Sequence, residues 1–206
     1  MIRVLIVDDQ AMVREALAAL LNLEDHIDVI AQAANGQEAL AVLAKAERDG
    51  TSIDVALLDV EMPVMDGITA AARIREQFPT VRILMVTTFG KPGYVNRAIT
   101  AGADGFVVKD APAAELATAI ARVARGEHVV DPQLAVASLT RGTSPLSARE
   151  TEILQAVATG AAVRDIAATL YLHPGTVRNH ISAAITKTGA HDRTDAIRIA
   201  REAGWL

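Results

Sequence analysis

Apolar and polar positions form blocks of two lengths along the first 125 residues. Short, nearly continuous apolar runs are typical of buried strands, and five of them end near Val7, Ala33, Leu58, Val86 and Val108. The segments between them repeat apolar residues at helical spacing, as in 11–21 and 113–125. This alternation predicts an α/β domain, a doubly wound, flavodoxin-like five-stranded parallel sheet with helices on both faces.

A different pattern begins after residue 125. Turn-forming residues are frequent over 126–144, which predicts a linker. Four short helical segments follow, at 148–158, 163–170, 174–187 and 193–203. Ser147 and Glu150 have capping-box spacing before the first, and Pro174 stands at the start of the third. The second and third helices are a helix-turn-helix candidate, so we predict domains at 1–125 and 145–206.

Three carboxylates stand at the ends of two predicted strands, Asp59 after the run 55–58 and Asp8 with Asp9 after the run 3–7. The carboxyl ends of parallel strands form the crevice where open α/β sheets bind ligands. If the strands are neighbours, these like charges repel unless a cation neutralises them. Mg²⁺ suits such an all-oxygen site and leaves room for a phosphoryl group. A plainer interpretation is that Asp9 caps the next helix and Asp59 ends a strand.

Two more polar residues end strand-like runs. Thr87 follows the run 82–86, and Lys109 follows the run 105–108. A hydroxyl group and an ammonium group at corresponding strand ends can hold phosphoryl oxygens by hydrogen bond and by charge. They favour the reactive interpretation of the carboxylates over the plainer one.

The set Asp8, Asp9, Asp59, Thr87 and Lys109 resembles the receiver domain of bacterial two-component response regulators. The resemblance implies that Asp59 accepts a phosphoryl group from a sensor histidine kinase. It further implies that Asp8, Asp9, Asp59 and the backbone carbonyl of Glu61 hold Mg²⁺, that Lys109 pairs with the phosphate, and that Thr87 and Phe106 act as the switch residues. Lys109 is followed by Asp110, where many receivers carry Pro.

Composition narrows the class of protein. The chain of 206 residues is 51% hydrophobic, has no cysteine and contains no apolar run of membrane-spanning length. We therefore expect no disulfide, no thiol catalysis and no zinc–thiolate site, and no insertion in a membrane. The N-terminus lacks the features of an export leader, so a cytoplasmic protein is expected.

The charge differs between the two predicted parts. Residues 1–144 carry 13 basic and 19 acidic side chains, net −6, whereas residues 145–206 carry 7 and 6, net +1. This asymmetry indicates that the acidic residues of the first part bind the metal and that any binding of polyanionic DNA belongs to the second part. A net charge of +1 is small, so DNA affinity depends on where the arginines sit and on pairing two copies.

The third helix of the second part has one polar side. Arg178 can read guanine and Asn179 adenine, Thr176 and Lys187 can hold phosphates, and Ser182 adds a donor. His180 either contacts a phosphate or packs inside the domain. An ordinary solvated helix face also explains these residues.

Residues 146–200 resemble the LuxR/NarL-type DNA-binding domain. The matching positions are Leu146-Ser147, Arg149-Glu150, Gly160, Ile166-Ala167, Thr176-Val177, His180, Ile185, Lys187, Gly189 and Arg193-Thr194. The resemblance implies that double-stranded promoter DNA is bound by Thr176, Arg178, Asn179, His180, Ser182, Lys187 and Arg193. Val163-Arg164-Asp165 and Arg178 depart from the common family residues, so the preferred DNA sequence can differ.

Four motifs are similar to the DesR-like subgroup of this family: Thr87-Thr88-Phe89, Pro92-Gly93-Tyr94, Gly175-Thr176-Val177-Arg178-Asn179 and the ending Gly204-Trp205-Leu206. That likeness implies control of membrane-lipid desaturation or of a membrane-stress response. It also implies a homodimer through the first and fifth receiver helices, with the region of the fourth helix and fifth strand as the other possible face. Phosphorylation is then expected to pull Thr87 inward, let Phe106 fill the space, and pair two recognition helices on DNA.

Two other functions compete with this one. A metal-dependent phosphohydrolase could use Asp59 as a covalent nucleophile, but such enzymes need an acid–base Asp two residues later, where this chain has Glu61. A transcription factor that acts independently of phosphorylation would retain the acidic pocket only as a remnant. We expect a regulator and not an enzyme, with self-catalysed phosphotransfer and autodephosphorylation as its only chemistry.

Overall fold

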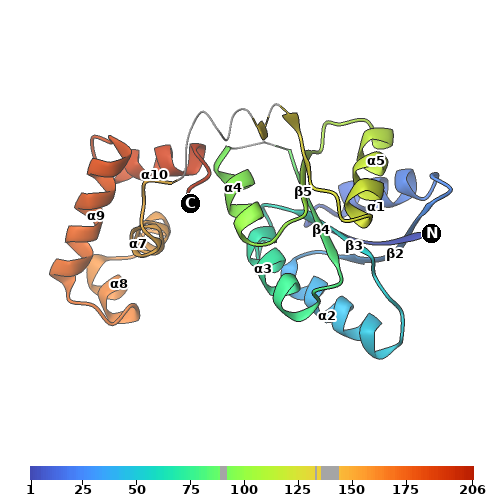
Figure 1. Ribbon diagram of the computed structural model, residues 1–206. Helices are drawn as coiled ribbons and strands as arrows, with labels where there is room; N and C mark the ends of the chain where they lie inside the picture. The colour runs from blue at the N-terminus through green and yellow to red at the C-terminus, as the bar shows by residue number, and fades with distance from the viewer. Residues whose placement is uncertain (89–91, 133, 136–143) are drawn as a thin grey trace. The chain divides into compact units, whose positions relative to one another are not determined.

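The computed structural model describes residues 1–88, 92–132, 134–135 and 144–206. These residues form two compact units (Figure 1). We call the sheet with the helices between its strands the N-terminal unit, and the helices after residue 144 the C-terminal unit. Part of the predicted linker, residues 133 and 136–143, and the predicted feature Phe89 lie outside the described residues. The predicted domain boundaries stay predictions.

The N-terminal unit is built on one parallel sheet with strand order β2-β1-β3-β4-β5-β6. This order confirms the predicted flavodoxin-like class. The strands are β1 (Ile2–Val7), β2 (Ile27–Ala33), β3 (Val55–Asp59), β4 (Arg82–Thr87), β5 (Gly105–Val108) and β6 (Val129–Val130).

The sixth strand was not predicted. Val129 and Val130 pair with Gly105 and Phe106 of β5, inside the segment that we interpreted as linker. Two apolar residues are too short for any periodicity, so only the neighbouring edge of β5 identifies them as a strand.

Helices cover both faces of the sheet, as predicted (Figure 1). They are α1 (Ala11–Leu21), α2 (Gly36–Arg48), α3 (Gly67–Gln77), α4 (Pro92–Thr100) and α5 (Ala113–Ala124). Alternate strand residues such as Val4, Ile6 and Leu57 pack with α1 and α5 in one buried cluster. Residues between them, such as Leu5 and Leu58, are also fully buried and face the other layer of helices.

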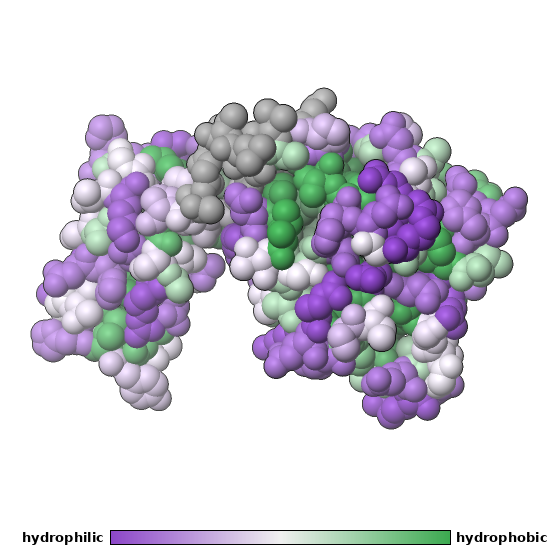
Figure 2. All heavy atoms as spheres, viewed as in Figure 1, coloured by the Kyte–Doolittle hydropathy of each residue, from purple (hydrophilic) through white to green (hydrophobic). Residues whose placement is uncertain are grey.

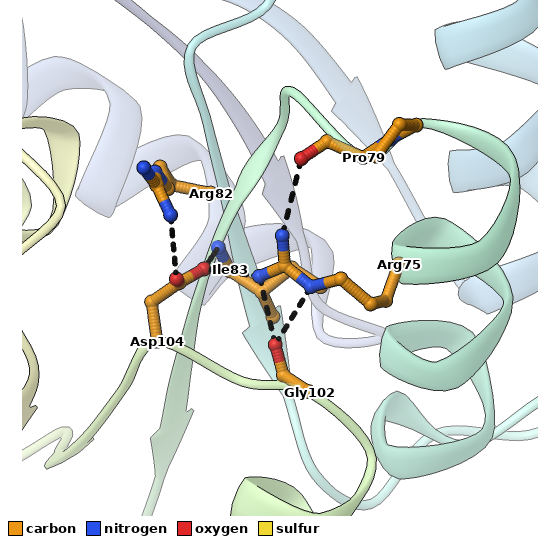
Figure 3. Close-up of polar contacts among 6 residues, drawn as sticks. All are labelled: Arg75, Pro79, Arg82, Ile83, Gly102 and Asp104. Atoms are coloured by element: carbon orange, nitrogen blue, oxygen red, sulfur yellow. Dashed lines mark hydrogen bonds and ion pairs between the residues drawn. The ribbon is translucent and has the colours of Figure 1, made fainter.

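The amino edge of the sheet is closed by a group of residues that we call the Asp104 clamp: Arg75, Arg82, Ile83, Gly102 and Asp104 (Figure 3). The Asp104 carboxylate accepts from Arg75 Nη2 at 2.5 Å, Arg82 Nη1 at 3.1 Å and the Ile83 backbone N–H at 2.8 Å. Arg75 also donates to the Gly102 carbonyl. The clamp therefore ties the end of α3 to the starts of β4 and β5.

The surface is mostly hydrophilic on the face that Figure 2 shows, with one apolar strip over the region of α4 and β5. Ile99 of α4 is 52% exposed. More of the exposed large apolar side chains lie along α1, where Met12 is 83% exposed and Leu20 45%, and just after it at Leu23, 77%. The helices of the described part of the chain are all too short or too polar to cross a bilayer.

The C-terminal unit has the predicted helices α7 (Ala148–Ala158), α8 (Val163–Thr169), α9 (Pro174–Thr188) and α10 (Arg193–Glu202). The predicted capping box is present at the start of α7, where Ser147 and Glu150 exchange hydrogen bonds. Pro174 occupies the first turn of α9, as predicted. Val177 and Ile181 of α9 are buried among residues of α7 and α8, so one face of α9 packs and the other is left outside.

Candidate functional site

Asp59 is the last residue of β3 and is 7% exposed. Its Oδ1 accepts a hydrogen bond of 2.8 Å from the backbone N–H of Val60. A β-carbon on Gly67, at the start of α3, would lie 1.9 Å from the Asp59 carbonyl oxygen. Only glycine lets α3 start so close to the strand end, and this packing fixes the backbone of Asp59.

Asp8 and Lys109 meet Asp59 in the crevice. Lys109 Nζ lies 2.6 Å from Asp8 Oδ2 and 2.8 Å from Asp59 Oδ2. All three side chains are at least nine-tenths buried. Strands β1 and β3 are neighbours, as the convergence of these residues requires. Two buried carboxylates therefore share one ammonium group.

Asp9 completes the acidic group from its exposed edge. Carboxylate oxygens of Asp8, Asp9 and Asp59 all lie within 4.8 Å of one another, a spacing that a metal ion can bridge. Asp9 does not cap α1, because the N-cap residue is Gln10 and it makes no side-chain capping bond. The Gln10 backbone N–H donates instead to Asp8 Oδ1 at 2.9 Å. The plainer interpretation of Asp9 as a helix cap is therefore wrong.

Burial dominates the protonation chemistry of this crevice. Burial raises the pKa of the Asp59 carboxyl, and the neighbouring Asp8 charge raises it further, against the opposing effect of Lys109. For Lys109, burial alone favours the neutral amine, but its hydrogen bonds and charge interactions with Asp59 and Asp8 outweigh burial and raise its pKa. Lys109 is thus held as a cation, while ionised Asp59 is only partly compensated.

Thr87 and Phe106 lie on adjacent strands next to this crevice. Thr87 is 4% exposed, and its carbonyl accepts a 2.7 Å hydrogen bond from the Lys109 N–H. Phe106 is fully buried and in register with Met85, while Thr87 is in register with Val108. The side chains of Thr87 and Phe106 therefore share one face of the sheet, two residues apart along it.

Glu61 lies in the loop from β3 to α3, with its side chain exposed. The same loop holds a turn that sequence reasoning missed. The Met65 N–H bonds the Pro63 carbonyl at 2.7 Å, and the residue between them, Val64, has φ 68°. This three-residue turn is rare and strained, above all for a β-branched residue.

In the C-terminal unit, α8 and α9 form the predicted helix–turn–helix arrangement. Arg178, Asn179, Ser182 and Arg193 are exposed, while Thr176 and His180 are half-buried. Arg178, Asn179 and Ser182 thus lie together on the outer side of α9, opposite buried Val177 and Ile181.

Lys187 has a structural partner that the sequence did not reveal. Its Nζ lies 2.9 and 2.7 Å from the two carboxylate oxygens of Glu150, which is 5% exposed. Burial opposes ionisation of Glu150, but Lys187 and Ser147 prevail and lower the pKa of this carboxyl. Lys187 thus joins the end of α9 to the capping box of α7, and this ion pair competes with the phosphate contact that we predicted for it.

Sequence reasoning named Arg149 as a matching position but missed its contact with the turn after α8. Its guanidinium donates to the carbonyl of Leu170, the C-cap residue of α8, at 2.8 Å, and pairs with Glu152. A side chain from α7 therefore braces the turn that leads into α9. The motif Ser147–Glu150 pointed to a helix start and not to this second contact.

Two family models match the chain. Residues 4–121 match the response regulator receiver domain, and residues 144–200 match the bacterial regulatory proteins of the luxR family.

Similar proteins support the same division. The uncharacterized transcriptional regulatory protein YvfU of Bacillus subtilis (strain 168) is 43% identical, with 100% of both chains covered. Transcriptional regulatory protein DesR of the same organism is 39% identical, again over 100% of both. Among solved structures, the response regulator ChrA of a heme-sensing two-component system is 34% identical with a TM-score of 0.57, over 100% of this chain and 98% of that one.

Proposed function

This chain belongs to the response regulators that combine a receiver domain with a LuxR-family DNA-binding domain, a family of non-enzymatic transcription regulators, and from that premise we propose that phosphorylation of Asp59 controls promoter binding. A sensor histidine kinase supplies the phosphoryl group. The observation that carries the proposal is the sharing of Lys109 by buried Asp8 and Asp59. A phosphoryl group on Asp59 brings oxygens that Lys109 can bind by charge-assisted hydrogen bonds.

The carboxylates fit a hard divalent cation. Asp8, Asp9 and Asp59 supply oxygen atoms within 4.8 Å of one another, and among the described residues Lys109 is the one ammonium group paired with them. These three residues and the Glu61 carbonyl would hold Mg²⁺, the cation that tolerates such a partly hydrated carboxylate site. When bound, Mg²⁺ neutralises the negative charge of the acidic group and of an incoming phosphoryl group.

The switch runs through the strand next to Asp59. Thr87 can donate its hydroxyl to a phosphoryl oxygen, and its inward movement frees space on the face that it shares with Phe106. Phe106 is fully buried, so its movement repacks the surface around β5 and α4. A local charge event thereby becomes a change of surface.

The repacked N-terminal unit pairs with a second copy. We favour α1 together with α5 as the pairing face. Met12 and Leu20 of α1 are exposed, and their spacing of eight residues, about two turns, keeps them on one side of the helix. Leu23, just after the helix, is exposed as well. The region of α4 and β5 offers Ile99 as its exposed large apolar residue. Pairing juxtaposes two copies of α9 on a two-fold operator and raises affinity through effective concentration.

The target process that we propose is membrane-lipid desaturation or a membrane-stress response. It rests on the likeness of the described motifs around residues 92–94 and 204–206 to the DesR-like subgroup. Reading of the operator is assigned to Arg178, Asn179 and Ser182, with Thr176, His180 and Arg193 at its borders.

Light scattering tests the switch. The mass of the wild type and of Asp59→Ala is measured with Mg²⁺, with and without beryllofluoride, which stands in for a phosphoryl group. We expect the mass to double only in treated wild type. Asp28→Ala is the matched control, because it removes an exposed carboxylate from edge strand β2 of the same unit. Doubling in treated Asp59→Ala would contradict the assignment, and an unchanged wild type would favour regulation independent of phosphate.

Base reading has its own test. Arg178→Ala should weaken binding to a selected duplex by about 1–3 kcal/mol if Arg178 reads a base. Arg198→Ala removes the same charge, but Arg198 is already paired with Asp195 and Glu202 on α10 and should change binding little. Equal losses in the two variants would show that charge alone, and not base reading, accounts for the role of Arg178.

A further inference from the structure

The turn between α8 and α9 carries an exposed tyrosine in a backbone conformation that favours glycine. Tyr171 has φ 53° and is 96% exposed. The Tyr171 N–H bonds the Ala168 carbonyl at 3.3 Å, and the Leu172 N–H bonds the Ala167 carbonyl at 2.8 Å. This pair of bonds is a Schellman cap in which Tyr171 occupies the left-handed position.

The chain fills the same kind of position with glycine elsewhere. Left-handed glycines follow helices α2, α4, α5, α7, α9 and α10, at Gly50, Gly102, Gly126, Gly160, Gly189 and Gly204. At Gly160 and Gly189, in the same unit, an added β-carbon would meet nothing within 4 Å. Space is therefore not what selects glycine there, and the backbone angle is. At the end of α8 the left-handed position holds a tyrosine, whose β-carbon makes this backbone conformation unfavourable.

Packing of the tyrosine side chain does not offset this conformational cost. Tyr171 is almost fully exposed, whereas its neighbours Leu170 and Leu172 pack against the core of the C-terminal unit. Within the described residues, no hydrogen bond or ion pair involves the Tyr171 side chain. A strained, exposed side chain held by well-packed neighbours is the pattern expected of a contact residue.

The turn is also held from outside. Arg149 of α7 donates to the carbonyl of Leu170, the residue just before Tyr171. Leu172, just after it, packs against the core. The tyrosine is therefore presented in one place, two residues before the His173 N-cap of α9.

We propose that Tyr171 donates its phenol hydroxyl to a phosphate of duplex DNA beside the groove that α9 enters. The N-terminal residues of a recognition helix contact base edges, so residues just before it lie over the strand that borders the groove. Tyrosine hydroxyls are among the groups that bind DNA phosphates and fix the register of a protein on the duplex. The contact gives position and no sequence preference. It rests on the proposed DNA-binding function and extends it.

The test uses the full-length chain with Mg²⁺ and beryllofluoride, and a 30-base-pair duplex selected from a random library by the wild type. Binding is measured by fluorescence anisotropy, and unfolding by thermal melting. Tyr171→Gly restores the residue that the other six caps use, so we expect an unchanged or higher melting temperature. We expect the same variant to bind about 3- to 10-fold more weakly. Tyr171→Phe keeps the ring and removes only the hydroxyl, and it should lose a similar factor.

Three outcomes separate the possibilities. Unchanged binding by Tyr171→Gly, while Arg178→Ala is weakened, overturns the Tyr171 contact and leaves the proposed function standing. Weakened Tyr171→Gly with unchanged Tyr171→Phe overturns the hydroxyl–phosphate bond. Failure to select any duplex, or wild-type binding that Arg178→Ala does not alter, counts against the DNA-reading function itself.

Discussion

The two edges of the sheet hold buried carboxylates in opposite circumstances. At the amino edge, Asp104 accepts from two arginines and a backbone N–H. At the carboxyl edge, Asp8 and Asp59 share the single ammonium of Lys109, and Asp9 adds a third negative charge. The negative charge of the carboxylate is more than balanced at the amino edge, whereas at the carboxyl edge the negative charges exceed the positive one. The same strands connect the two edges.

The difference separates a structural site from the one that we propose to be reactive. A buried carboxylate with several donors is fixed, and its loss exposes unpaired partners. A carboxylate whose pKa burial raises is poised to change its state, which is typical of functional sites. Asp104 therefore belongs to the stability of the N-terminal unit, and the incomplete compensation of Asp59 fits the chemical role that we propose for it.

Asp104→Ala should have the largest effect on stability. It leaves Arg75, Arg82 and the Ile83 N–H without their shared acceptor, and the free energy of unfolding should fall by about 3–5 kcal/mol. Urea unfolding followed by circular dichroism measures this fall. Asp49→Ala, which breaks the exposed Lys45–Asp49 pair on α2, is the control and should leave the midpoint unchanged. A small loss in Asp104→Ala would mean that water replaces the clamp.

Removing a cation from each edge sharpens the contrast. Lys109→Ala leaves Asp8 and Asp59 without their shared partner and should cost about 3 kcal/mol. Arg82→Ala should cost below about 1 kcal/mol, because Arg82 is 40% exposed and Arg75 still pairs with Asp104. Melting with and without Mg²⁺ measures both. Mg²⁺ should stabilise both variants, because both keep the acidic site. The gain should be larger in Lys109→Ala, where the cation replaces the missing ammonium group, and equal gains in the two variants would contradict that compensation.

Asp59→Asn should stabilise the protein, by about 0.5–2 kcal/mol near neutral pH. The folded-state pKa of Asp59 is raised, so its favourable contribution exists below the ordinary Asp pKa of about 3.9 and is lost as pH rises through the higher folded value. The advantage of the variant should therefore grow as pH rises above about 4 and then level off. Urea midpoints of both proteins across pH 4–8, without Mg²⁺, measure it. A constant difference over that range would contradict the raised pKa.

Glu150 gives the opposite pH dependence within the C-terminal unit. Its folded-state pKa is lowered, so its contribution is present above the ordinary Glu pKa of about 4.3 and is lost as pH falls through the lower folded value. Glu150→Gln should cost about 0.5–1 kcal/mol near pH 7, because the amide keeps some capping ability but loses the charge pair with Lys187. The cost should shrink below about pH 4. Denaturation of the wild type and the variant at pH 3 and pH 7 tests this.

The sequence predicted the sheet and the helices well because their signals are local. Apolar runs and helical spacing repeat over many residues, and the strand order follows from parallel connections. The sixth strand escaped because Val129 and Val130 have no pattern of their own. The convergence of Asp8, Asp59 and Lys109 was predictable because all three stand at strand ends.

Pairings between distant residues were not predictable. In the sequence, Lys187 looks like one more cation on the polar face of a helix. Only the packing of α9 against α7 brings it to Glu150. Asp104 likewise looks like a loop residue, until α3 and β4 bring two arginines to it. The left-handed backbone of Tyr171 could not be predicted, because glycine, the usual sequence signal for that conformation, is absent from this position.

The internal ion pairs of the C-terminal unit limit how many counterions it can release from DNA. Of its seven basic side chains, Arg149, Lys187 and Arg198 already pair with carboxylates of the same unit. Arg164, Arg178, Arg193 and Arg201 are exposed and form no ion pair with any described residue. If all four met phosphates, log K would fall with log salt with a slope of at most about −3.6 for one copy and about −7 for two. The slope of log K against log salt, measured by titration, therefore distinguishes one bound copy from two.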